Sequence, residues 1–176
     1  MACNPLIEIS KSCGKENAAG LRDDVYLISY DSLSNITGST EVFSTSETGL
    51  ISAINAGANK FVKVGSVKNS NGLTENFTMN DNGSFDIVKE LTFSLSNVGS
   101  VSNKQGIEAL IGNPVSVIVK MRNGQHLALG LNGQLQLSGI TGEVNSGANG
   151  RTVTLNGSDT ELIQVVDPTI VAALLA

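Results

Sequence analysis

The stretch from Gly99 to Val166 limits the possible fold classes of this chain more than any other segment. It combines one short helical segment with several runs of β-forming residues. Its expected elements, in chain order, are a helix at 102–111, a β-hairpin at 114–130, a strand ending at 138, and strands at 151–155 and 161–166. Strands arranged around one short helix predict a mainly β fold, either a sandwich or a barrel.

Both ends of the expected helix carry sequence signals. Ser102 or Asn103 can accept a hydrogen bond from a free backbone N–H of the first turn, and Gln105 lies where a capping-box partner belongs if Ser102 is the cap. Gly112 tolerates the left-handed backbone that ends many helices, and Pro114 prevents continuation. The helix is therefore expected to be short.

Turn residues divide the rest of the second half into strands. Residues 115–121 are the most strongly β-forming run of the chain, and Asn123-Gly124 predicts the tight turn of a hairpin. Residues 139–150 contain four glycines and predict a flexible loop, while residues 156–159 predict a turn before the last strand.

The first half also alternates between β-forming runs and turns. Strands are expected at 25–30 and 41–44, whereas 46–56 has helical spacing but is limited by glycines. The block at 60–96 predicts two long strands joined at their tip by an extended connection rich in Asn and Gly. Within it, apolar residues at 91, 93 and 95 alternate with hydroxyl residues, so one face is expected to be buried and the other polar.

The length of 176 residues fits one domain. We expect an N-terminal arm at 1–21, a single β domain at 22–168 and an apolar tail at 169–176. The formal net charge is −5 and no basic face is visible, which argues against a protein that grips nucleic acid through its phosphates. Mild acidity serves either solubility or a surface that slides past a polyanion.

The two cysteines, Cys3 and Cys13, do not have the spacing of a redox pair or a zinc site. Free thiols in a reducing compartment are expected, and a disulfide in oxidising surroundings is the alternative. The first residues lack the basic and apolar regions of a signal peptide, and the apolar tail is too short to span a bilayer. No association with a membrane is therefore expected.

No group of residues has the pattern of a catalytic or cofactor site. His126 is the single histidine, and no nucleophile elbow accompanies it. Asp23 and Asp24 are adjacent, so in a strand they point to opposite faces. Residues 80–83 match part of a calcium loop without its closing Glu, and no phosphate-binding loop occurs. We expect no enzyme activity, no metal and no cofactor.

The apolar tail has two interpretations. Ile170, Val171, Leu174 and Leu175 share one face at helical spacing. Burying such side chains stabilises by roughly 1.5–3 kcal/mol each. They are expected either to pack on the chain's own body or to dock on a neighbouring subunit.

The order of these elements resembles a known protein family. Residues 138–144 and 149–157 place a Gly/Asn-rich loop before a Thr/Val/Leu strand and a final apolar strand. Together with the decorated hairpin and the helix that ends at 112–114, they resemble the tail tube proteins of tailed bacteriophages and the inner-tube proteins of contractile injection systems. The resemblance covers residues 22–168.

The resemblance implies a non-catalytic structural subunit with a tail-tube-like β-sandwich or barrel. Such subunits form rings, commonly hexameric, that stack around a channel through which genomic DNA passes without specific binding. Implied partners are further copies of the chain and other tail proteins, with assembly in the host cytoplasm and a final place in the virion tail. The implied inter-ring contact is the connection at 69–85, with Asn69, Ser70, Asn71, Gly72, Leu73, Asn80, Asp81, Asn82, Gly83 and Phe85.

The alternative function is that of a binding module. A phage head or tail decoration protein, or an adhesin-like β-sandwich, would bind a capsid or a glycan. Aromatic residues, which commonly build sugar-binding platforms, make up only 4% of the chain, and this argues against glycans.

Overall fold

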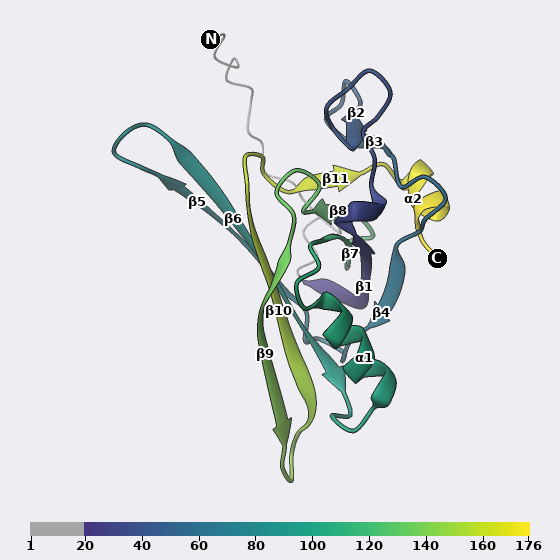
Figure 1. The fold of residues 1–176 in the computed structure, drawn as a ribbon, viewed down its shortest axis with the longest axis vertical. Helices are drawn as coiled ribbons and strands as arrows, with labels where there is room; N and C mark the ends of the chain where they lie inside the picture. Colours follow the sequence, from purple (N-terminus) through teal and green to yellow (C-terminus); the bar gives the residue numbers. More distant parts are fainter. Residues whose placement is uncertain (1–19) are drawn as a thin grey trace.

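In the computed structural model, which describes residues 20–176, the chain forms two open β-sheets that enclose a core (Figure 1). The mainly β sandwich is confirmed, and the described strands do not close into a barrel. The expected N-terminal arm, with Cys3 and Cys13, lies outside the described residues except for Gly20 and Leu21.

The larger sheet has seven strands in the order β2-β3-β11-β8-β7-β1-β4. All its pairs are antiparallel except β3 with β11. The strands are β1 (Leu21–Ser29), β2 (Phe43–Thr45), β3 (Ile51–Ile54), β4 (Val62–Gly65), β7 (Val115–Met121), β8 (His126–Leu129) and β11 (Gln164–Val166).

The smaller sheet has four antiparallel strands in the order β5-β6-β10-β9. They are β5 (Gly72–Met79), β6 (Phe85–Ser96), β9 (Gln136–Val144) and β10 (Asn149–Asp159). Figure 1 shows that these long strands extend beyond the seven-stranded sheet, the β5–β6 hairpin at one end and the β9–β10 hairpin at the other. The sheet therefore presents large surfaces outside the sandwich.

One hydrophobic cluster fills the space between the sheets. Val25, Val117, Phe93 and Val153, from strands of both sheets, are at most 1% exposed. Phe93 and Val153 alternate with half-buried residues that face outward, as strands with one buried face require. Ile107 of helix α1 (Val101–Leu110) joins the same cluster.

A second cluster covers the opposite face of the seven-stranded sheet. It contains Ile51, Phe61 and Ile118, which are fully buried, and Val171 and Leu174 of helix α2 (Pro168–Leu174). Because clusters lie on both faces, the first five residues of β7 are all buried. This explains why β7 is a continuous β-forming run and not an alternating one.

The first helix is confirmed, but its expected N-cap is wrong. Ser100 is the cap, and its side chain accepts a hydrogen bond from the N–H of Asn103 at 3.3 Å. Ser102 lies inside the helix, so Gln105 has no capping-box role. The stop signal is confirmed, since Gly112 has φ +75°. A second helix, α2, forms in the apolar tail and starts with Pro168 after the Asp167 cap.

The expected loop at 139–150 is wrong, because residues 139–144 belong to β9 and residues 149–150 to β10. Gly139 pairs with Thr154, and Gly142 pairs with Arg151. A Cβ on either glycine would lie 3.8 Å from the side chain opposite, so the glycines fit an ordinary antiparallel pair. Only residues 145–148 turn, and the Asn145 side chain accepts hydrogen bonds from the N–H groups of Gly147 and Ala148 at 2.8 Å.

The expected turn at 156–159 is also wrong, because β10 continues to Asp159. The block at 60–96 divides differently from the prediction: β4 pairs with β1 in the larger sheet, whereas β5 and β6 pair with each other in the smaller one. The ambiguous segment at 46–56 contains strand β3 and no helix.

Candidate interaction surfaces on the four-stranded sheet

The β5–β6 hairpin carries an apolar stripe past the edge of the core. Paired positions from Leu73 and Leu91 outward to Met79 and Phe85 lie on the core-facing side of the sheet. Beyond Ile87, which is 4% exposed, no part of the sandwich covers this side. We call residues 76–88 the projecting hairpin.

Three large apolar side chains stand uncovered on the projecting hairpin. Phe77 is 56% exposed, Met79 65% and Phe85 49%. The rings of Phe77 and Phe85 stack with centroids 5.9 Å apart and planes 26° from parallel. A contiguous exposed apolar group at the end of a hairpin is typical of a protein-binding surface.

The residues expected at the inter-ring contact fall into two places. Asn80, Asp81, Asn82 and Gly83 form the tight turn at the tip, closed by a hydrogen bond from the Asn80 N–H to the Ser84 carbonyl at 2.8 Å.

The earlier turn lies at the opposite end of β5. Asn71 donates its side-chain N–H to the Arg22 carbonyl at 2.6 Å, and the Asn69 N–H is 3.2 Å from the Asp23 carboxylate. The Ser70 hydroxyl accepts the Ser94 N–H at 3.2 Å. These residues therefore anchor the start of β5 to β1 and β6, and the connection at 69–85 is a strand with a turn at each end and not one loop.

The face of the four-stranded sheet opposite the core is rich in hydroxyl groups. Ser94 and Thr152 are neighbours across β6 and β10, with their oxygens 3.0 Å apart. Three carboxylates, those of Asp86, Glu90 and Glu143, lie at the outward positions of the register. None of the outward positions of β5, β6, β9 and β10 holds Lys or Arg. We call this the cation-free face.

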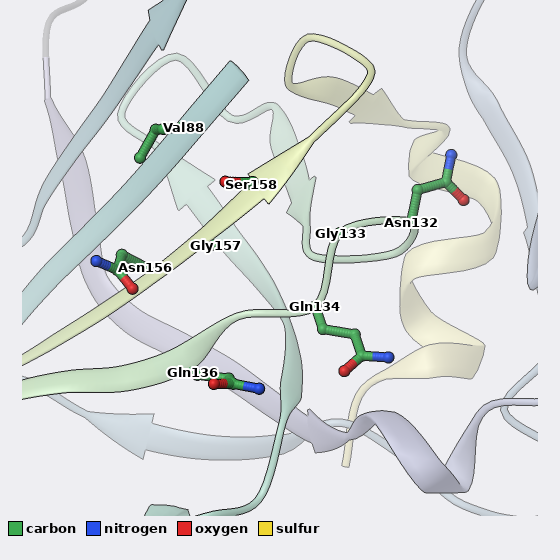
Figure 2. A pocket seen from close by; sticks show the side chains of 8 residues that line it. All are labelled: Val88, Asn132, Gly133, Gln134, Gln136, Asn156, Gly157 and Ser158. Atoms are coloured by element: carbon green, nitrogen blue, oxygen red, sulfur yellow. The ribbon is translucent and has the colours of Figure 1, made fainter. Parts of the chain in front are cut away.

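The cation-free face has a hollow of about 560 Å³, where residues 132–136 fold against β6 and β10. Figure 2 shows its labelled lining residues. The lining consists of Val88, Asn132, Gly133, Gln134, Gln136, Asn156, Gly157 and Ser158. Amides and one hydroxyl form hydrogen bonds but supply no acid, base or strong nucleophile at neutral pH.

The apolar tail packs on its own chain. Val171 and Leu174 are each 8% exposed in the second cluster, and Ile170 and Leu175 pack against it. The N–H of Phe61 donates to the Leu174 carbonyl at 2.9 Å, and this hydrogen bond joins the end of α2 to the residue that precedes β4. Of the two arrangements expected for the tail, the structure has the intramolecular one. Among the four apolar side chains of the prediction, Ile170 and Leu175 are half-buried and keep some surface for a neighbour.

The candidate acid–base residues do not converge. Asp24 forms an exposed ion pair with Lys63 at 2.9 Å, while the Asp23 side chain accepts the Asn69 N–H. Among residues 20–176, no three His, Asp or Glu side chains form a group that could hold a metal ion. No helix in this range has the length and apolar character needed to cross a bilayer.

His126 is a buried histidine on β8. Burial, followed by the charges of Lys120 and Arg22, lowers its pKa below 6.5. Its Nδ1 atom has no hydrogen-bond partner among the described residues. The neutral ring is therefore the form that fits the folded protein.

This burial predicts a pH-dependent stability. The unfolded chain binds a proton at His126 more tightly than the folded one, so the free energy of unfolding should fall as the pH is lowered through 6.5. Urea unfolding across this pH range measures the effect. His126→Gln should flatten the curve there, and an unchanged slope in this variant would contradict the prediction.

Sequence reasoning included Phe85 and the tip but missed Phe77 and Met79. The signal was present: apolar residues recur at alternate positions from Phe85 to Leu95 except at Lys89, and the partner strand has Leu73, Phe77 and Met79 in the same phase, interrupted by Glu75. The cation-free face is likewise visible as alternating Thr and Ser once the strand bounds of β10 are known.

Comparisons of the chain with protein-family models, with curated proteins and with solved structures return no match.

Proposed function

We propose that this chain is a structural subunit that assembles with its own copies into stacked rings of a phage-like tail tube, in the virion tail. The observation that carries the proposal is the projecting hairpin, whose stacked Phe77 and Phe85 are about half exposed in the described part of one copy. Burying large apolar side chains of this kind stabilises by roughly 1.5–3 kcal/mol each. A neighbouring copy is the proposed cover.

The four-stranded sheet suits ring closure. Its edge strands are β5 and β9, and an even number of alternating strands makes β9 of one copy antiparallel to β5 of the next. Edge pairing of this kind satisfies the free N–H and C=O groups of both strands. A heterologous contact that repeats around an axis closes into a ring.

The cation-free face is the proposed channel wall. Lys and Arg side chains bind DNA phosphates and displace the counterions of the DNA, which makes binding favourable. A wall without Lys and Arg therefore binds DNA only weakly. Hydroxyl groups form hydrogen bonds with water at such a wall, and the carboxylates of Asp86, Glu90 and Glu143 repel phosphates. DNA would pass along this surface without specific binding.

Assembly of the purified protein tests the proposal. Negative-stain electron microscopy and analytical ultracentrifugation at increasing concentration should show rings or tubes. Phe77→Ser/Phe85→Ser should form no stacked tubes, with unchanged circular dichroism. Val101→Ser removes a side chain that is 68% exposed on α1 and serves as the matched control, expected to assemble normally.

A wild-type protein that remains a monomer at high concentration would overturn the proposal. It would then favour the alternative, a decoration or adhesin-like module that binds a different surface. Deleting the tip at 80–83 separates the two functions further, because a tube subunit should lose stacking while a decoration protein should still bind its target.

A further inference from the structure

Lys89 and Asp159 form the one ion pair that is buried among the described residues. Their side chains are 4% and 6% exposed, and Lys89 Nζ lies 2.6 Å from Asp159 Oδ2. The two residues are on the adjacent strands β6 and β10, on the core-facing side at the root of the projecting hairpin. A buried charge pair usually requires further hydrogen bonds to offset its desolvation.

The Asp159 carboxyl group is held in a fixed orientation. While Oδ2 faces Lys89, Oδ1 accepts the backbone N–H of Thr160 at 2.7 Å and that of Glu161 at 3.3 Å. If a nucleophile attacks Cγ, negative charge develops on Oδ1, where two N–H donors are already in place. Such preorganised donors stabilise a tetrahedral intermediate.

A third group that can carry protons lies beside the pair. Burial raises the pKa of Glu161, and the charges of Glu41 and Asp159 raise it further, whereas Lys89 and Gln164 act in the opposite direction. A carboxyl group that titrates closer to neutral pH is better suited to general acid–base transfer.

The surroundings of the pair contain almost no space for water. The cavity lined by Lys89, Asp159 and Glu161 has a volume of about 10 Å³, close to the minimum for one water molecule. Phe43, Ile51 and Leu131 also line it. Exclusion of water favours condensation over hydrolysis and disfavours a permanently charged pair.

We propose that Lys89 and Asp159 condense into an intramolecular isopeptide bond. Glu161 takes a proton from the Lys89 ammonium, the neutral Nζ attacks Asp159 Cγ, and the Cγ–Oδ2 bond breaks. Two Nζ protons leave with Oδ2 as one water, the third stays on the amide nitrogen, and Glu161 ends as it began. The charges of the pair cancel, and no oxidant or reductant takes part.

The bond would tie β6 to β10 at the point where the projecting hairpin leaves the sandwich. It would also replace a buried ion pair by a neutral amide, which is less costly to keep out of water. This inference does not depend on the proposed assembly, because the reacting groups belong to one chain.

Mass spectrometry of the purified, folded protein tests the bond. The wild-type chain should be lighter than its sequence by one water, and proteolysis should release a branched peptide joining Lys89 to Asp159. Lys89→Arg and Asp159→Ala should have full mass and no branched peptide. A wild-type chain of full mass after prolonged incubation, with folded circular dichroism, would overturn the proposal.

Two further measurements test the specificity of the reaction. Lys63 and Asp24 are 2.9 Å apart but exposed, so they are the matched pair and should remain unlinked. Linkage at both pairs would overturn the assignment to a preorganised site. Glu161→Gln should fold and form the bond much more slowly, and wild-type rates in this variant would overturn the role given to Glu161.

Discussion

Gly157→Ala should destabilise the protein by about 3 kcal/mol or more, because overpacking against rigid backbone is among the more costly substitutions. A Cβ at this position would overlap the carbonyl oxygen of Gln134 and lie 3.0 Å from that of Gly133. Neither atom is the end of a flexible side chain, so β10 or the segment at 132–136 must move. Urea unfolding at neutral pH measures the loss.

Gly133, on the other side of the same close approach, leads to a second prediction of the same kind. A Cβ on Gly133 would overlap the Ser158 carbonyl oxygen and approach the Asp159 Cα to 2.9 Å. Gly133→Ala should therefore be destabilised to a similar extent. Because the two sites share one contact, the double variant should lose less than the sum of the single losses.

Gly139→Ala is the matched control in the same sheet. Its Cβ would lie 3.8 Å from the Thr154 Cβ, which is an ordinary contact, so stability should change by no more than about 1 kcal/mol. Equal stabilities of Gly157→Ala and Gly139→Ala would contradict the close backbone approach seen between β10 and residues 132–136.

The same glycine explains why part of the fold could not be predicted from the sequence. Asn156, Gly157 and Ser158 have the composition of a turn, yet they continue β10 because they pair with residues 88–90 of β6. Residue 157 is a glycine because the backbone at 133–134 crosses so closely that no side chain fits. The glycines of β9 were misread for a related reason, since their partners Thr154 and Arg151 lie on another strand. Such requirements come from tertiary contacts, which local composition does not contain.

Elements whose signals are local were predictable. The β7–β8 hairpin follows from its β-forming run and the Asn123-Gly124 turn, and Gly124 has φ +98°. The end of α1 follows from Gly112. In contrast, the parallel contact of β3 with β11 pairs Ile51 with Val166, and no local sequence signal near either residue predicts it.

The candidate surfaces were predictable only in part. The turn at 80–83 was expected within the connection at 69–85, but the apolar Phe77 and Met79 of the same connection were not singled out. Whether alternate residues are buried or exposed depends on where the opposite sheet ends, and this is a property of the assembled sandwich. The Lys89–Asp159 pair was missed because its members lie far apart in the sequence and meet only through the β6–β10 register.

Asp159→Ala should cost at least ~3–5 kcal/mol of unfolding free energy, because it leaves the Lys89 ammonium buried without its partner. It also removes the carboxyl group needed for the proposed bond. Asp24→Ala breaks the exposed pair with Lys63, whose side chains are 35% and 52% exposed, and should cost far less, because solvent screens the charges of an exposed pair. Urea unfolding of both variants gives the contrast.

A double variant separates the two contributions of the buried pair. Lys89→Met/Asp159→Leu fills the same space without charge, so it should recover the part of the loss that comes from the unpaired ammonium. It cannot recover stability that comes from a covalent link between β6 and β10, which constrains the unfolded chain. If the double variant is as stable as the wild type, the pair acts through charge alone. If it is less stable, Glu161→Gln measured before its bond has formed identifies the cause, because this variant keeps the ion pair but lacks the covalent link. A loss of stability that Glu161→Gln does not share would come from packing in the double variant. A small loss in Asp159→Ala, equal to that of Asp24→Ala, would show that Lys89 reaches water in the folded protein, contrary to its 4% exposure.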